Sequence, residues 1–210
     1  MSGVARHRLA SPLLQLPLAV AVGALMAFDP LLALAGFVAL VAVWPPAVPW
    51  RPVRTVRVLS AYALFLPVWL LLLLGYLEAA HALGFDVPPQ TALQELADPN
   101  LPAADLAVRV LGIVVLAPLL EEIFFRGYLF TALALLLPKW ATQVVTSLLF
   151  GLAHGLAYAL PIGLLALLLG FLRQRHASLA PPVLAHALHN GIVVGVTLLW
   201  PTTLDLLYPR

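Results

Sequence analysis

Residues 110–137 read VLGIVVLAPLLEEIFFRGYLFTALALLL, an apolar run of helical length that is interrupted by a few charged side chains. These are Glu121, Glu122 and Arg126. One ionised side chain in the middle of a bilayer costs about 2.5 to 3.5 kcal/mol on insertion scales, so such residues are candidates for function. The stretch predicts a membrane helix that carries a polar site.

The composition of the whole chain supports a membrane protein. Of its 210 residues, 63% are hydrophobic and 10% are charged, whereas soluble domains have about 25% charged residues. So apolar a chain has too little polar surface to cover a fold that faces water. We therefore expect an all-α fold, a polytopic transmembrane helix bundle with about six to eight helices.

Several apolar segments can supply these helices. They are Leu13–Phe28, Leu31–Trp44, Leu59–Leu77, Ala103–Leu137, Ala141–Leu160, Ile162–Leu172 and Pro182–Trp200. The segment 103–137 is longer than the roughly 20 residues that cross a bilayer, and Pro118 is a candidate for a break in it. We expect the first segment to be a retained helix rather than a signal peptide, because the nearest small-x-small site lies within further apolar sequence.

The basic residues of the loops predict an orientation. They are Arg6, Arg8, Arg51, Arg54, Arg57, Lys139, Arg173 and Arg175. The positive-inside rule places these residues and the N-terminus in the cytoplasm. The segment 78–105 carries several acidic residues with Arg and Lys absent, and we expect it outside.

The charge pattern and the lack of cysteine exclude some functions. The isoelectric point is about 9.3, but the basic residues are scattered and form no basic face, which argues against a nucleic-acid partner. The chain has no cysteine, so it forms neither disulfides nor thiolate metal sites and has no Cys nucleophile.

The Glu-Glu pair is the first of three polar clusters within the apolar segments. Glu122 and Arg126 are four residues apart and share one helix face, so they can neutralise each other as an ion pair. Glu121 is turned about 100° away and lacks that partner. The alternative is that both acids and the arginine form one structural network.

His154 is the centre of the second cluster and follows Phe150 by one helical turn. A single histidine in an apolar segment is more often a core residue than a catalytic one. Counted from Pro138, Glu121 lies 17 residues before and His154 lies 16 residues after. An antiparallel helix pair that turns at Pro138 therefore brings both to a similar depth.

His186 and Asn190 form the third cluster and share a helix face, with His189 as a partial competitor for the same role. The Asn190 amide and a ring nitrogen of His186 can both donate, so together they can hold a developing oxyanion. Interhelical hydrogen bonding is the structural alternative. On the expected topology His186 lies nearer the cytoplasm than Glu121, so tilt, a partial crossing or a break near Pro118 is needed to join them.

These three motifs resemble those of the CPBP family, the type 2 CAAX prenyl proteases and bacteriocin-processing enzymes, which are also described as glutamic-type intramembrane proteases. The family pattern is Glu-Glu-x-x-x-Arg, then Phe-x-x-x-His, then His-x-x-x-Asn. Here the pattern stands as Glu121, Glu122, Arg126, Phe150, His154, His186 and Asn190. The resemblance covers about residues 103–200.

The resemblance implies a role for each motif residue. Glu121 is the general base that activates water, assisted by His154, and the hydroxide attacks a peptide carbonyl. His186 and Asn190 stabilise the oxyanion. Glu122 and Arg126 brace the helix or orient neighbouring groups.

A zinc site is the alternative to this metal-free mechanism. Glu121, His154 and His186 could supply the three protein ligands of a catalytic zinc, and family members are often labelled metalloproteases. The strong zinc motif HExxH is absent, and Asn190 suits an oxyanion donor better than a metal ligand. We therefore expect no metal cofactor.

Other protease classes and other functions fit the sequence less well. No Ser lies in a Gly-x-Ser context beside a His, and there is no Gly-x-Gly-Asp with a second membrane Asp. A non-catalytic binding or immunity protein would be favoured by degenerate motifs, and none is degenerate. A proton-coupled transporter is a third possibility, against which the lack of internal repeats argues.

We expect three parts: N-terminal helices with an acidic external loop at 1–102, a catalytic helix core at 103–200 and a tail at 201–210. The partners implied are membrane lipid and a protein or peptide substrate with a membrane-associated segment. CAAX-type tails, leader sequences and C-terminal sorting segments are the substrate classes that the family implies. We expect a multi-pass protein of the bacterial inner membrane.

Overall fold

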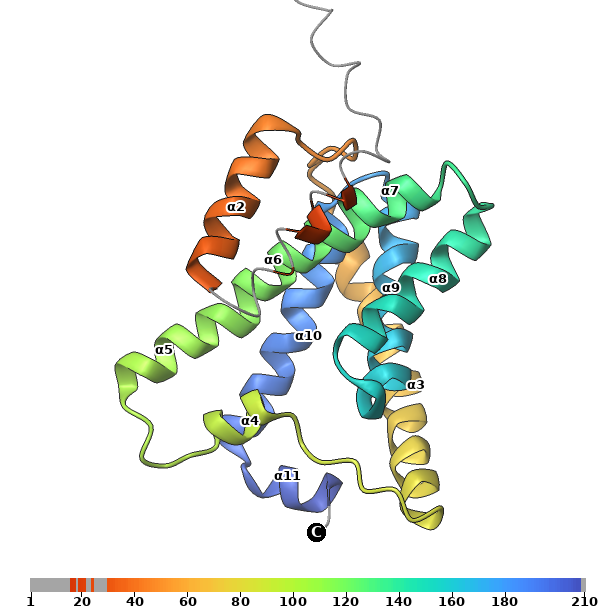
Figure 1. Cartoon of the computed structure of the whole chain (residues 1–210). Helices are drawn as coiled ribbons and strands as arrows, with labels where there is room; N and C mark the ends of the chain where they lie inside the picture. Colours follow the sequence, from red (N-terminus) through yellow and green to blue (C-terminus); the bar gives the residue numbers. More distant parts are fainter. Residues whose placement is uncertain (1–15, 18, 22–23, 25–29, 209–210) are drawn as a thin grey trace, which may run out of the picture.

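The computed structural model describes residues 16–17, 19–21, 24 and 30–208, and these form helices with no strand among them (Figure 1). The expected segment Leu13–Phe28 lies largely outside the described residues. The helices are α2 (Pro30–Val43), α3 (Thr55–Ala82), α4 (Thr91–Leu96), α5 (Ala103–Leu111), η3 (Gly112–Leu116), α6 (Ala117–Glu122), η4 (Ile123–Leu129), α7 (Phe130–Leu133), α8 (Lys139–Ala153), η5 (Leu156–Tyr158), α9 (Ala159–His176), α10 (Ala180–Leu199) and α11 (Thr202–Leu207).

Four helical runs among the described residues are long and apolar enough to cross a membrane. They are Thr55–Ala82, Ala103–Leu133, Leu156–His176 and Ala180–Leu199. Many large hydrophobic side chains on them are exposed, such as Leu64, Leu71 and Val108. A water-facing protein would bury these side chains, whereas a bilayer solvates them. The chain is therefore an integral membrane protein, and the expected transmembrane helix bundle is confirmed.

The run from Ala103 to Leu133 stays helical through Pro118, so the break considered at this proline does not occur. The turn before the proline has a π register, in which the Ala117 N–H bonds to the carbonyl of Gly112, five residues back. Proline lacks an N–H and its ring clashes with the carbonyl four residues earlier in an α-helix. The wider π turn accommodates the proline without ending the helix.

Tilt of this run brings the three motifs together. In Figure 1 the segment from α5 to α7 crosses α10 obliquely, with α9 beside α10 and α8 beside α9. Glu121, near the end of the α6 part of this run, thereby reaches the depth of His186 although His186 follows the start of α10 closely. Of the three explanations open from the sequence, the break does not occur, and the oblique crossing is the geometry that tilt requires.

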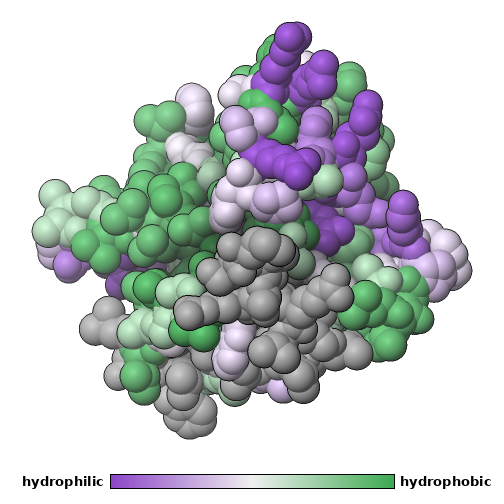
Figure 2. Space-filling view, turned by 90° about the horizontal axis from the view of Figure 1, so that it is seen from above, coloured by the Kyte–Doolittle hydropathy of each residue, from purple (hydrophilic) through white to green (hydrophobic). Residues whose placement is uncertain are grey.

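The basic loops meet at one end of the bundle. The Arg51 N–H bonds to Ser178 Oγ, and the Ser178 hydroxyl donates to the Arg51 carbonyl, both at 3.0 Å. These bonds join the loop before α3 to the turn between α9 and α10, which begins at Ala177 with a left-handed φ of 47°. Figure 2 looks onto this end and shows hydrophilic side chains beside hydrophobic flanks.

α8 and α9 pack closely around Gly151. An added Cβ at Gly151 would overlap the Ala159 carbonyl oxygen and would lie 3.0 Å from the Gly163 nitrogen. The connection between the two helices turns through Gly155, whose φ is 100°. This close packing places the end of α8, and with it His154, against the bundle.

Replacing Gly151 by Ala should therefore destabilise the protein. Because the new methyl group meets backbone atoms rather than a flexible side chain, we expect a loss of about 1 to 3 kcal/mol in unfolding free energy, measured by denaturation in detergent micelles. Gly195→Ala on α10 is the matched control, because a Cβ added at Gly195 would have no neighbouring atom within 4 Å. Equal stabilities of the two variants would contradict the close packing.

Candidate active site

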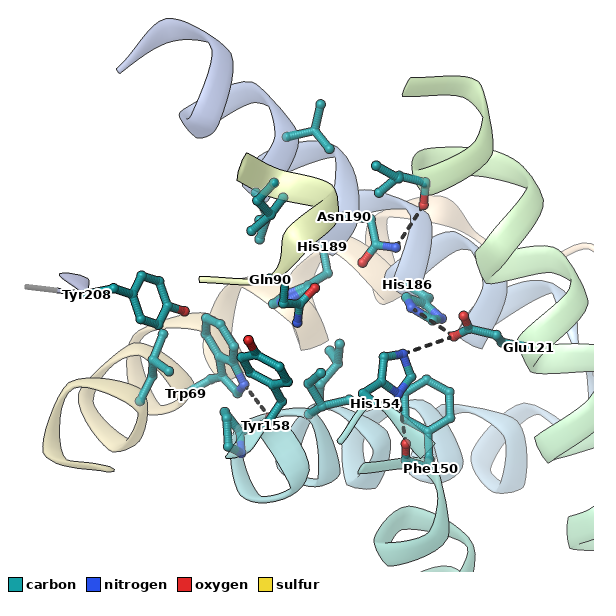
Figure 3. A pocket seen from close by; sticks show the side chains of 18 residues that line it. Trp69, Gln90, Glu121, Phe150, His154, Tyr158, His186, His189, Asn190 and Tyr208 are labelled. Atoms are coloured by element: carbon teal, nitrogen blue, oxygen red, sulfur yellow. Dashed lines mark hydrogen bonds and ion pairs between the residues drawn. The ribbon is translucent and has the colours of Figure 1, made fainter. Parts of the chain in front are cut away.

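A cavity of about 150 Å³ lies between the membrane helices, and residues of all three motifs line it (Figure 3). Its polar walls come from the 103–133 run, the end of α8 and α10, while α3 and α9 supply apolar walls. The lining residues that carry polar groups are Trp69, Gln90, Glu121, His154, Tyr158, His186, His189, Asn190 and Tyr208. A cavity of this size holds several water molecules.

Glu121 stands between two histidines. Its Oε2 lies 3.8 Å from Nε2 of His154 and 3.8 Å from Nε2 of His186. The same oxygen is buried and accepts no hydrogen bond from any residue that the structure describes. Side chains from α6, the C-terminal end of α8 and α10 thus converge on one carboxylate oxygen (Figure 3). A separation of this length leaves the carboxylate free to bond a bridging water.

His154 is held by the backbone of its own helix. Its Nδ1 lies 2.8 Å from the carbonyl oxygen of Phe150. A carbonyl only accepts, so Nδ1 must carry the proton and donate it. In the neutral ring, Nε2 therefore has a free lone pair, and this is the nitrogen that faces Glu121.

His186 is oriented by the second acid of the pair. Its Nδ1 lies 3.0 Å from Glu122 Oε1, which also accepts from Arg126 Nη1 at 2.8 Å. Because a carboxylate paired with a guanidinium is an acceptor, His186 donates its Nδ1 proton to it. The Nε2 of His186 is then the nitrogen turned toward Glu121.

The Glu122–Arg126 pair lies fully inside the bundle, with the two side chains 0% and 1% exposed. Arg126 also donates from Nη2 to the Ala166 carbonyl at 3.0 Å and lies 4.5 Å over the Phe150 ring. The sequence pattern predicted this ion pair, and the structure confirms it. Phe150 thus contributes to the site through its ring and through its carbonyl.

Asn190 points toward the cavity from α10, one turn after His186. Its Nδ2 donates to the Ile113 carbonyl at 2.8 Å, which leaves a second amide hydrogen and the amide oxygen for other partners. The structure therefore places Asn190 near the two histidines and also gives it a backbone partner that the sequence did not indicate.

His189 also lines the cavity, but it is held from the opposite side by α3. Its Nδ1 lies 3.0 Å from the Tyr62 hydroxyl, and its ring packs edge-on against Trp69 at 4.7 Å. Sequence reasoning missed Tyr62 and Trp69. The signal available was the presence of aromatic residues with polar groups in an otherwise apolar segment.

Short helices cover the cavity at the end away from the basic loops. Gln90 and Leu93 of the α4 region and Tyr208 after α11 line it there. The Tyr158 hydroxyl donates to the Pro88 carbonyl at 2.7 Å and so tethers the loop before α4. Burial, and next the neighbouring Tyr158 phenol, raise the pKa of Tyr208, so its hydroxyl stays neutral near neutral pH.

The three donors of the zinc alternative lie around the same cavity, and the choice between zinc and a metal-free site stays a prediction. Among the described side chains, no group of three or more His, Asp and Glu residues is arranged so that it could hold a metal ion. The Nε2 atoms of His154 and His186 do face Glu121, but the three donors do not form such a group.

Comparison with known proteins gives one match. A family model, Rce1-like, described as type II CAAX prenyl endopeptidase Rce1-like, matches residues 103–192. This range begins at α5, ends within α10 and contains Glu121, His154, His186 and Asn190. It agrees with the resemblance expected over 103–200. No curated protein and no solved structure matches the chain.

Arg126→Leu should strongly destabilise the protein, because it leaves the Glu122 carboxylate buried without its charged partner. We expect a loss of about 3 to 5 kcal/mol in unfolding free energy, measured by denaturation in micelles. Arg109→Leu is the control, because Arg109 pairs with Glu95 at a site where both side chains are more than 40% exposed, and we expect a loss of about 0 to 1 kcal/mol there. Similar losses in the two variants would contradict a structural role for the buried pair.

Proposed function

Through residues 103–192 this chain belongs to the Rce1-like family of type II CAAX prenyl endopeptidases, and we propose that it is an intramembrane endopeptidase. Its substrate would be a membrane-associated protein or peptide, whose peptide bond it hydrolyses. The observation that carries this proposal is the Glu121 Oε2 atom, which is buried, accepts no hydrogen bond from the described residues and lies 3.8 Å from two imidazole nitrogens.

In the proposed reaction Glu121 activates a water molecule. The carboxylate accepts a proton from water, and the water oxygen forms a bond to the peptide carbonyl carbon. His154 assists, because its Nε2 is a free acceptor facing the same oxygen of Glu121. The proton taken from water later goes to the leaving amine when the carbon–nitrogen bond breaks.

The proposed oxyanion site lies on α10. Asn190 has one amide hydrogen left after its bond to Ile113. His186 already donates its Nδ1 proton to Glu122, and its Nε2 faces Glu121. When the proton that Glu121 takes from water passes to this Nε2, the ring becomes an imidazolium that donates to the oxyanion, and the same proton then goes to the leaving amine. Donors fixed in a cavity that excludes bulk water stabilise such a charge more than water does.

Glu122 and Arg126 act indirectly in this proposal. They neutralise each other, and Glu122 sets which nitrogen of His186 faces the cavity. Arg126 adds contacts to α8 and α9 through Phe150 and Ala166. Their role is to hold the reacting groups in place rather than to contact substrate.

We propose that the reaction uses no metal ion. The reaction above needs only a carboxylate, imidazoles and an amide. The two imidazoles and the amide each have a hydrogen-bond partner that orients them, and the imidazoles face the carboxylate. The Asn190 amide suits an oxyanion donor and is a poor ligand for zinc.

The substrate class proposed is a peptide with a membrane-associated segment, such as a CAAX-type tail, a leader sequence or a C-terminal sorting segment. The apolar walls of the cavity, among them Leu73, Ile162 and Leu165, suit an extended apolar peptide better than a charged one. The protein would act in the bacterial inner membrane.

Glu121→Gln should abolish the activity while leaving the fold intact. Glutamine has nearly the same shape, but it cannot accept a proton from water at neutral pH, so we expect a loss of at least about 100-fold. The measurement is mass spectrometry of membrane-protein termini in cells that carry the wild-type or the Glu121→Gln protein.

The matched control for that experiment is Glu95→Gln, because Glu95 lies on α4 and pairs with the exposed Arg109. The control should yield the same new termini as the wild type. A folded, membrane-inserted Glu121→Gln protein that yields them at the wild-type level would refute the protease proposal.

The proposed orientation places Lys139 in the cytoplasm and Asp98 outside. The chain has no cysteine, so one introduced cysteine reports its own position. In bacterial spheroplasts, we expect Asp98→Cys to react with a membrane-impermeant maleimide and Lys139→Cys to react only after permeabilisation. The reverse pattern would contradict the proposed orientation.

A further inference from the structure

Pro118 leaves a backbone carbonyl without a partner in the helix that carries Glu121. In an α register the Ile113 carbonyl would accept from the N–H of Ala117, and in a π register from the N–H of residue 118. Ala117 instead donates to Gly112, and proline has no N–H. The helix itself therefore supplies neither of the usual donors for the Ile113 carbonyl.

Asn190 supplies the donor that is missing. Its Nδ2 lies 2.8 Å from the Ile113 oxygen, across an interface between segments 77 residues apart in the chain (Figure 3). A carbonyl that has no donor in its own helix is costly inside a membrane protein unless a side chain or a water molecule bonds to it. The bond therefore gives the Ile113 carbonyl a specific partner on α10.

The next residue of α10 also contacts the segment that carries Ile113. A Cβ built on Gly191 would lie 3.6 Å from Val114 Cγ1, in ordinary contact. The backbone of α10 thus comes close to the π segment just where Asn190 bonds to it. His186 lies one turn before Asn190, and Glu121 lies three residues after Pro118, so this interface links the elements that carry both.

We propose that Pro118 is a positioning residue for catalysis. By withholding an N–H, it reserves the Ile113 carbonyl for Asn190, and this bond fixes the register between Glu121 and His186 and aims the remaining amide hydrogen of Asn190 at the cavity. The inference rests on the proposed protease function. It gives Asn190 a second task, which differs from oxyanion stabilisation.

The proposal requires that Pro118 and Asn190 act as a unit. An alanine at position 118 restores an N–H that can bond within the helix, so the Ile113 carbonyl no longer depends on Asn190. If Asn190 acted only as an oxyanion donor, Asn190→Ala would change the unfolding midpoint and kcat by the same amount whether residue 118 is proline or alanine. A double-mutant cycle separates these cases, because only residues that share an interaction give non-additive effects.

The cycle uses the full-length wild type, Pro118→Ala, Asn190→Ala and the double variant in detergent micelles. The control cycle replaces Pro118→Ala by Pro67→Ala, because Pro67 also lies inside a membrane helix, α3. The first readout is the thermal unfolding midpoint. We expect Asn190→Ala to lower it by about 2 to 4 °C when residue 118 is proline and by less than about 1 °C when it is alanine.

The second readout is cleavage of a synthetic peptide that spans a site found in the comparison of membrane-protein termini. We expect each single variant to lower kcat by about tenfold, with KM little changed, because positioning affects the transition state more than binding. The double variant should be no more than about threefold slower than the slower single variant. In the control cycle, the losses of kcat caused by Pro67→Ala and by Asn190→Ala should multiply.

The two readouts separate the two proposals. Additive shifts of the unfolding midpoint at positions 118 and 190 would overturn the positioning proposal, whether or not the protein cleaves peptides. Multiplicative losses of kcat would also overturn it, since Asn190 would then act independently of Pro118. Coupled unfolding midpoints without any cleavage that depends on Glu121 would overturn the protease function and retain only the bond between the helices.

Discussion

The buried ion pair between Glu122 and Arg126 is the interaction on which the site depends. Two charges in a membrane bundle are tolerated when they neutralise each other and make further polar contacts. Arg126 does this by contacting α9 through the Ala166 carbonyl and α8 through the Phe150 ring. Glu122 contacts α10 through His186. A single ion pair thus joins every helix that carries a histidine of the site.

The adjacent acid, Glu121, has the opposite environment. Consecutive residues of a helix differ by about 100° in direction, so one acid faces the bundle and the other faces the cavity. Glu122 is bound through Oε1 to an arginine and a histidine, whereas neither oxygen of Glu121 is paired with an arginine in the described part of the chain and its Oε2 lies between two imidazoles. The Oε2 atoms of both acids lack a hydrogen-bond partner among the described residues. The pair of acids therefore combines a structural charge with a carboxylate that is free to react.

Much of the fold and part of the site could be predicted from the sequence. Rare charges in an apolar chain indicated membrane helices, and helical spacing indicated the Glu122–Arg126 pair, because both depend only on local periodicity. The continuous helix at Pro118 could not be predicted, since a proline predicts a kink or a break and the π register depends on neighbouring helices. The partners of Asn190 and His189 also depend on tertiary contacts, with Ile113 and Tyr62.

The central claim is that Glu121, His154 and His186 hold a reactive water without a metal ion. The most direct measurement is an experimental structure of the full chain, with diffraction data also collected at the zinc absorption edge. The account predicts an ordered water within about 3 Å of Glu121 Oε2 and of a histidine Nε2, with no anomalous peak at that position. A zinc peak bound by these three residues, or a Glu121 side chain turned away from both histidines, would contradict it.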